Sequence, residues 1–163
     1  AAGISHTLPV SLIDREKFEQ VVTLNAEAAL FLAKAMLSAS IRDDRGGSIV
    51  FISSIMSMVS QPAISSYSFS KAALTGLTKS LAIEFAPKNI RVNCVSPAYV
   101  RTPLLDDMIK KWSKDQIEEL INRHPLGLGE IQDVAYSTAF LLSEAARWIT
   151  GSNLVIDGGY TAL

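Results

Sequence analysis

The sequence has little cysteine and histidine and no excess of charge of either sign. It contains one cysteine, Cys94, two histidines, His6 and His124, and 15 basic against 16 acidic side chains among 163 residues. One thiol cannot form an internal disulfide, which favours a reducing, cytoplasmic setting over secretion. The two histidines stand far apart without acidic or cysteine partners, so no metal site is expected. A net charge of −1 without a basic block gives no indication of nucleic acid or of an anionic membrane.

The sequence also lacks an uninterrupted apolar run of the length that a membrane span needs. The longest apolar stretch, residues 21–41, contains Asn25, Glu27 and Lys34, which would be costly in hydrocarbon. The N-terminal residues have neither the charged start nor the apolar centre of a signal peptide. With no repeats, linker or low-complexity segment, residues 1–163 are expected to belong to a single domain of a soluble protein.

Short apolar runs alternate with helical patterns along the chain. Strands are predicted at residues 48–53, 90–96 and 153–157, from their β-branched and aromatic composition. Helices are predicted at residues 11–40, with Asp14 as N-cap, at 66–85, as two short pieces within 103–124, and at 132–144. This alternation is typical of the α/β class, with a doubly wound parallel sheet.

The stretch SSYSFSK, residues 65–71, places a tyrosine and a lysine four positions apart. On a helix, Tyr67 and Lys71 would share one face. A nearby ammonium favours the phenolate and lowers the pKa of a phenol, which would suit Tyr67 to general acid–base catalysis. Ser54 follows the strand at 48–53, and ligands of parallel α/β sheets bind at the carboxyl ends of strands. The alternative is an ordinary pair in the first turn of a helix.

Taken together with motifs elsewhere, the whole of residues 1–163 resembles the short-chain dehydrogenase/reductase family. The family pattern of a serine, a tyrosine thirteen residues later and a lysine four residues after that fits Ser54, Tyr67 and Lys71. Further segments match the family in order: AAGIS, TLNAEAALF, GSIVFISS, IRVNCVSPAYVRTPL, PLGLGEIQDVAYSTAFLLSE and ITGSNLVIDGGY. The resemblance implies a Rossmann-like fold and hydride transfer between NAD or NADP and a carbonyl or alcohol.

The resemblance also implies roles for four catalytic residues. Tyr67 would be the general acid in reduction and the general base in oxidation. Lys71 would lower the pKa of Tyr67 and hold the nicotinamide ribose, and Ser54 would orient the reacting oxygen. Asn25 would hold the water that continues the proton path from Lys71.

The remaining site residues follow from the same resemblance. Besides Tyr67 and Lys71, the cofactor is expected to contact Ala2, Gly3, Pro97, Val100 and Thr102. The substrate is expected to contact Ser54, Tyr67, Ala98, Met108 and Trp112.

Residues 103–124 correspond to the substrate-binding flap of the family. Their apolar stripes would equally suit two surface helices that pack on the core. The family usually has asparagine where this chain has Ala1 and glycine where it has Ala98, so the shape of the substrate pocket is expected to differ.

The glycine-rich phosphate-binding turn of the family is absent from this sequence, as is the residue that selects NAD or NADP. The resemblance covers the C-terminal two-thirds of a typical family chain, so the cofactor preference stays open. Because the strand at 48–53 is apolar on both faces, it is expected to be an interior strand. We therefore expect the N-terminal strands of the sheet to come from a preceding segment of the same protein or from a second chain.

Several functional alternatives remain from the sequence. The substrate would be either a 3-oxoacyl thioester or a sugar, polyol or other small alcohol. A catalytically silent binding or regulatory subunit and a structural fragment that forms oligomers are the alternatives to an enzyme. The helices at 20–41 and 66–85 carry few charges, so a homodimer or homotetramer built on them is expected.

Overall fold

The computed structural model describes residues 3–37, 46–110 and 112–162, and its centre is a parallel sheet. Three strands hydrogen-bond in the order β1-β2-β3, with bounds Gly47–Ile52, Ile90–Pro97 and Asn153–Ile156. Cys94 of β2 lies opposite Phe51 on one side and Asn153 on the other. The three strands lie where the sequence predicts them, and the parallel α/β class is confirmed.

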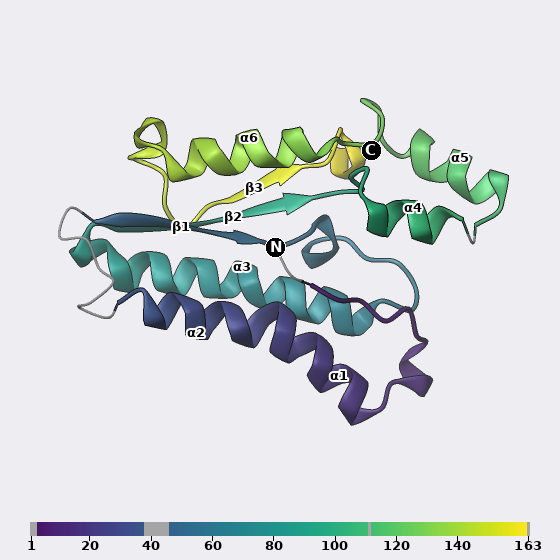
Figure 1. Ribbon diagram of the computed structural model, residues 1–163, viewed down its shortest axis with the longest axis horizontal. Coiled ribbons are helices and arrows are strands. Elements are labelled where there is room, and N and C mark those ends of the chain that lie inside the picture. Colours follow the sequence, from purple (N-terminus) through teal and green to yellow (C-terminus); the bar gives the residue numbers. More distant parts are fainter. Residues whose placement is uncertain (1–2, 38–45, 111, 163) are drawn as a thin grey trace.

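Helices cover both faces of this sheet (Figure 1). On one face lie α1 (Arg15–Val22), α2 (Ala28–Ala35) and the long α3 (Ser65–Phe85), and on the other lies α6 (Ile131–Leu142). Two short helices, α4 (Pro103–Ile109) and α5 (Lys114–Asn122), lie beyond the carboxyl ends of the strands. The sheet and its helices thus form three layers, and the expected pair of short helices within 103–124 is present.

The core fills the space between the sheet and α3. Leu74, Leu81 and Phe85 of α3 pack against Phe51 and Val92, and all five side chains are buried. A smaller cluster on the opposite face is formed by Val95, Leu141 and Ala146, with Val50 and Ile52 half-buried against it. The strands are apolar on both faces because helices cover both faces of the sheet.

The first predicted helix is present from Arg15 to Ala35, shorter at both ends than the predicted residues 11–40, and it contains one irregular turn. Asp14 caps its start as expected, since the carboxylate accepts a hydrogen bond of 2.8 Å from the backbone N–H of Lys17. Between α1 and α2, however, residues Thr23–Glu27 form a π-helical turn. Such turns inside α-helices occur frequently at functional sites, and this one contains Asn25. The end of the predicted helix and most of the turn after it, residues 38–45, lie outside the described residues.

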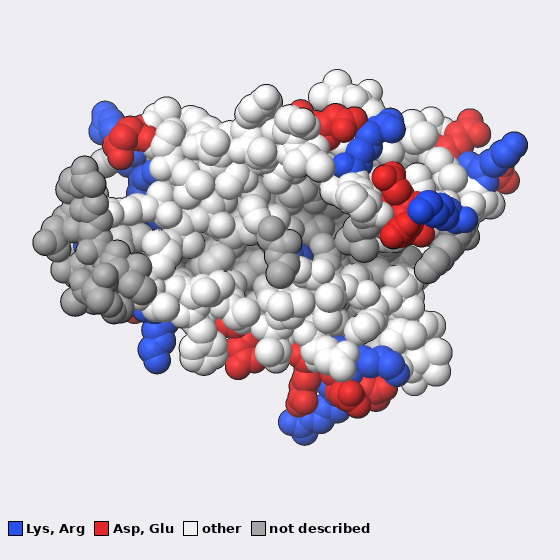
Figure 2. All heavy atoms as spheres, in the orientation of Figure 1, with Lys and Arg blue, Asp and Glu red and all other residues white. Residues whose placement is uncertain are grey.

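Strand β1 occupies an edge of the sheet within the described ranges, because β2 is its only partner there. Ile49 and Phe51 of β1 are nevertheless buried, and the expectation that β1 is an interior strand stays a prediction. Among the described helices, none combines the length and apolar content needed to span a membrane. Figure 2 shows that charged side chains in this view lie mostly around the rim of the molecule, including near α1 and α5, with both signs mixed, and that the middle carries few charges.

Candidate active site

Tyr67 and Lys71 lie in the first two turns of α3, near the carboxyl end of β1. Lys71 is 6% exposed, and its ammonium Nζ donates a hydrogen bond of 2.9 Å to the carbonyl of Ile52, the last residue of β1. The same nitrogen lies 5.6 Å from the centre of the Tyr67 ring. The two side chains therefore share one face of α3, as their spacing predicts, and both are directed toward the strand end.

Burial is the main influence on the electrostatics of this pair. Burial raises the pKa of Tyr67 above its ordinary value, and a hydrogen bond with Ser54 acts in the opposite direction. Burial also lowers the pKa of Lys71. The expectation that Lys71 lowers the pKa of Tyr67 stays a prediction.

Ser54 stands where β1 ends and a short 3₁₀ turn, Ile55–Ser57, begins. Its hydroxyl oxygen accepts a hydrogen bond of 3.2 Å from the backbone N–H of Met56 and lies 3.5 Å from the carbonyl oxygen of Pro97. The hydrogen bond that affects the Tyr67 phenol comes from this same side chain. The structure thus brings Ser54 and Tyr67 together, and the cap on Met56 fixes the position of Ser54.

Asn25 joins the site from the π-helical turn. Its amide nitrogen donates 2.9 Å to the carbonyl of Ile4 and 3.0 Å to the hydroxyl of Ser70, and its amide oxygen accepts 2.9 Å from the N–H of Ile4. Both amide N–H groups are used, so one acceptor position on Oδ1 remains. That oxygen and Lys71 Nζ lie 3.4 and 3.8 Å from the point where a β-carbon on Gly3 would stand. The role of Asn25 in holding a water stays a prediction.

Two serines that the sequence analysis did not single out support this arrangement. Ser70 is fully buried, donates a hydrogen bond of 2.8 Å to the Tyr67 carbonyl and accepts the bond from Asn25. Ser53 donates 2.8 Å to the carbonyl of Lys71. Both are positioning residues, since they fix the backbone that carries Tyr67 and Lys71. The sequence feature that could have pointed to these serines is the number of hydroxyl groups in residues 53–54 and 65–70. Which of these hydroxyl groups face inward depends on the tertiary structure.

The residues assigned to the cofactor by resemblance surround the same strand ends. Gly3 lies beside Asn25 and Lys71, Pro97 ends β2, Val100 forms a β-bridge with Gly129, and Thr102 caps α4. Lys71 uses one of its three N–H donors on Ile52, and no further partner is found among the described residues. A buried ammonium with two N–H groups left for a ligand fits the ribose hydroxyls of a nicotinamide cofactor. Ala2 lies outside the described residues and stays a prediction.

The residues assigned to the substrate are only partly brought together. Ala98 and Tyr67 pack on one apolar cluster formed by Ile55, Met56 and Ile64. Trp112 lines a cavity together with Tyr99, which the sequence analysis did not single out. Met108 is half-buried on α4 and is not among the residues that line that cavity. Within the described part of the chain, no three histidine, cysteine or acidic side chains are grouped as metal ligands would be.

Comparisons with known proteins show which family this chain resembles in sequence and structure. Residues 1–161 match the family described as enoyl-(acyl carrier protein) reductase. The chain is 39% identical over 160 residues to a 3-oxoacyl-[acyl-carrier-protein] reductase of Rickettsia prowazekii, covering 97% of this chain and 64% of the relative. A crystal structure of a 2-deoxy-D-gluconate 3-dehydrogenase from Agrobacterium tumefaciens with bound NADP, so named provisionally, matches with a TM-score of 0.93 and 30% identity. That match covers 100% of this chain and 66% of the other.

A third comparison, 4-hydroxyisoleucine dehydrogenase complexed with NADH, matches with a TM-score of 0.89 and 38% identity, covering 100% of this chain and 67% of that one. The chain spans about three-fifths of the length of the curated relatives it matches. The match extends over nearly the whole chain, and in the structure Asn25, Ser54, Tyr67 and Lys71 meet at the carboxyl end of one sheet. The chain belongs to the short-chain dehydrogenase/reductase family.

Proposed function

We propose that the protein is an NAD- or NADP-dependent oxidoreductase that interconverts a carbonyl and an alcohol. The observation that carries this proposal is the Lys71 ammonium, buried beside Tyr67 with a single protein acceptor at 2.9 Å. A buried charge with unused donors is costly unless a ligand completes its hydrogen bonds. A nicotinamide ribose offers the hydroxyl groups that would do so. When bound, the nicotinamide would supply or accept the hydride.

The side chains of this chain would handle the oxygen and its proton. Tyr67 would give its phenolic proton to the carbonyl oxygen in reduction and take it back in oxidation. Ser54, held by the N–H of Met56, would hydrogen-bond the same oxygen and orient it. Lys71 would hold the cofactor ribose, and the free acceptor position of Asn25 would bind the water through which the proton reaches solvent. Gly3, Pro97, Val100 and Thr102 would border the cofactor.

The proposal is tested by assaying the full protein with acetoacetyl thioesters and with sugars, polyols and cyclic alcohols. Each compound is offered with NAD and NADP, or with their reduced forms, because relatives have been seen with either NADP or NADH. A compound-dependent change in nicotinamide absorbance supports the proposal. No change with any of these pairs would contradict it and would favour a silent binding subunit. The packed contacts among Asn25, Ser70, Tyr67 and Lys71 support the enzyme.

Residues 1–163 are proposed to form the C-terminal part of one Rossmann-like domain, with residues 103–124 as its substrate flap. Support for the first point is that the relatives continue beyond the matched region. Support for the second is that α4 and α5 lie beyond the strand ends, beside the site. The single, buried Cys94 supports a cytoplasmic location.

The raised pKa of Tyr67 gives an expectation for titration of the cofactor-free protein. Because burial disfavours the phenolate, Tyr67 should ionise above the ordinary tyrosine value of about 10. Its acid form, which reduction needs, should then persist throughout the neutral range, and the base form should appear only in alkaline solution. The measurement is the phenolate absorbance of the wild type minus that of Tyr67→Phe. A Tyr67 signal that appears below about pH 9 would show that burial does not dominate.

A second proposal concerns assembly. Leu30, Phe31 and Leu32 of α2 and Phe69 and Ile83 of α3 are exposed, with Ile83 at 79% and Leu32 at 68%. Large apolar side chains gathered on neighbouring helices mark an interaction surface. A second copy of the chain would cover them in a two-fold interface, so we expect a homodimer or homotetramer.

The assembly is measured by light scattering at micromolar concentration. Leu32→Glu combined with Ile83→Glu should shift the protein toward a smaller species, because the charges would be buried in the interface. Val10→Glu is a matched control, since Val10 is also 79% exposed but lies in the short 3₁₀ turn before α1. A wild-type monomer, or no effect of the double change, would contradict this interface.

A further inference from the structure

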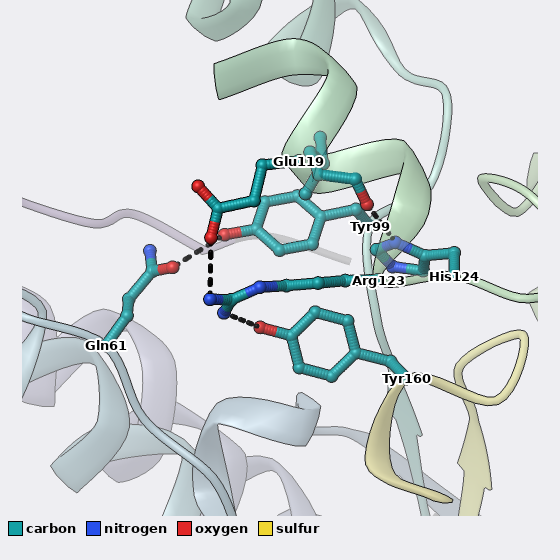
Figure 3. A network of polar contacts seen from close by, with 7 residues as sticks. Gln61, Tyr99, Glu119, Arg123, His124 and Tyr160 are labelled. Atoms are coloured by element: carbon teal, nitrogen blue, oxygen red, sulfur yellow. Dashed lines mark hydrogen bonds and ion pairs between the residues drawn. The ribbon is translucent and has the colours of Figure 1, made fainter. Parts of the chain in front are cut away.

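A small cavity lies between the flap and the C-terminal turn of the chain, and Figure 3 shows the residues around it. Lys71 and Tyr67 are not among the residues that line it. Its volume is about 200 Å³. Its walls come from four parts of the chain: the loop after β1, the loop after β2, α5 with Trp112 before it and Arg123 after it, and the C-terminal turn. The side chains used below are Gln61, Tyr99, Trp112, Glu119, Arg123 and Tyr160.

Tyr99 lines this cavity and also lies close to Tyr67 of the candidate active site. Tyr99 and Tyr67 pack on the same apolar cluster of Ile55, Met56 and Ile64. The two phenols are close enough that charge on Tyr67 contributes to the raised pKa of Tyr99. A molecule whose reacting oxygen is held at Tyr67 can therefore place the rest of its body against Tyr99.

The walls of the cavity are aromatic and are held rigidly. The rings of Tyr99 and Trp112 meet edge to face with centres 6.5 Å apart, and those of Tyr99 and His124 do so at 5.8 Å. The His124 ring also lies 5.0 Å from the Tyr160 ring, and its Nδ1 donates 2.7 Å to the Leu120 carbonyl. These contacts fix the ring planes, so the cavity offers flat apolar surfaces to a ligand.

The charges at the cavity cancel. Arg123 donates a hydrogen bond of 2.7 Å to the Glu119 carboxylate and one of 3.3 Å to the Tyr160 hydroxyl (Figure 3). The other residues that line the cavity are uncharged. A ligand carboxylate that approached Arg123 would also meet Glu119, and this repulsion acts against anionic ligands.

The cavity nevertheless offers a hydrogen bond to a neutral oxygen. The Tyr99 hydroxyl donates 3.2 Å to Gln61 Oε1, which fixes the orientation of the amide. The Gln61 amide N–H groups have no further partner among the described residues and can donate to a ligand. A volume of about 200 Å³ is below the range of pockets for drug-sized ligands. A single ring therefore suits this space.

We propose that Tyr99, Trp112 and Tyr160 select a small, neutral, ring-containing ketone or secondary alcohol as the substrate. The Glu119–Arg123 pair lines the cavity and disfavours substrates with a carboxylate, and Gln61 binds a neutral oxygen of the ring or of its substituent. This inference rests on the proposed oxidoreductase function, because it concerns the body of the molecule whose oxygen Tyr67 would hold.

The first test compares three carbonyl compounds with the full protein and its preferred nicotinamide. Cyclohexanone should give a kcat/KM about tenfold or more above that of 4-oxocyclohexanecarboxylate, which adds only a charge, and above that of an acetoacetyl thioester. Glu119→Gln should raise the value for the carboxylate relative to cyclohexanone by up to about fivefold, as expected for one exposed charge pair. A wild-type preference for the carboxylate or the thioester would overturn the inference.

The second test uses the two tryptophans of the chain. Trp112→Ala should lower kcat/KM for cyclohexanone about tenfold, mainly through KM, because an apolar wall is lost. Trp148→Ala is the matched control, since Trp148 is 91% exposed and does not line the cavity. Equal kinetics of the two variants would contradict a role for Trp112.

A binding measurement separates failure of this inference from failure of the proposed function. Trp148→Phe leaves Trp112 as the sole tryptophan of residues 1–163, and cyclohexanol should then change the fluorescence relative to the same protein with Trp112→Phe, without any turnover. Turnover of an acyclic carbonyl together with no response of Trp112 to cyclohexanol would overturn the inference and leave the oxidoreductase standing. No turnover of any carbonyl, together with no response of Trp112, would overturn both.

Discussion

Tyr67→Phe should reduce turnover by roughly 10²–10⁴-fold, the range expected when a general acid–base group is lost. Phenylalanine keeps the ring that packs on Ile55, Met56 and Ile64 and removes only the hydroxyl that interacts with Ser54. Cofactor binding should therefore stay close to that of the wild type, since the Lys71 bond to Ile52 does not involve the phenol oxygen. The measurements are kcat with a carbonyl substrate and nicotinamide binding by fluorescence.

Tyr136→Phe is the matched control for this change. Tyr136 is 72% exposed on α6 and shares a cavity with Ala98 and Val100, but it has no interaction with Tyr67 among the described residues, so loss of its hydroxyl should leave kcat much closer to the wild type than Tyr67→Phe does. A Tyr67→Phe protein that kept most of its turnover would show that another group transfers the proton.

Lys71→Met should also abolish most of the turnover, by about 10²-fold or more, and it should weaken nicotinamide binding as well. Methionine keeps an apolar stem of similar length and removes the ammonium, which lies near the Tyr67 ring and has donors left for a ribose. The joint loss of kcat and cofactor affinity distinguishes Lys71 from Tyr67, whose change should affect kcat alone.

Protein stability separates a functional from a structural role for Lys71. Burial lowers the pKa of Lys71, so below the unfolded pKa of lysine the protonated form is less favourable in the folded than in the unfolded state. Methionine at this position removes that penalty. The free energy of unfolding should therefore not fall by more than the contribution of the one hydrogen bond to Ile52. Lys79→Met, an exposed lysine on the same helix, should leave kcat and cofactor binding unchanged. A large loss of stability in Lys71→Met would indicate that Lys71 is mainly structural.

The sequence by itself determined the layers of the fold and the placement of Tyr67 and Lys71 side by side. Apolar strands alternating with helical patterns predict a parallel sheet with two covered faces, because backbone pairing and apolar periodicity are local properties of the chain. The placement of Tyr67 and Lys71 on one face of α3 follows from helix geometry alone. The position of Ser54 at a strand end indicated a third residue, and the family resemblance added Asn25, which no local pattern would have joined to them.

Only the tertiary structure decided which hydrogen bonds hold these side chains in place and how burial shifts their pKa values. Asn25 lies on a π-helical turn within what the periodicity predicts as one regular helix. From this turn it bonds to Ile4 and Ser70. The rise in the Tyr67 pKa depends on how much water the packed site excludes, and this is a property of the whole fold. The cavity between Tyr99, Trp112 and Tyr160 joins residues about 50 to 60 positions apart. Contacts between such distant residues depend on the packing of α5 and the C-terminal turn around the strand ends, which sequence periodicity does not encode.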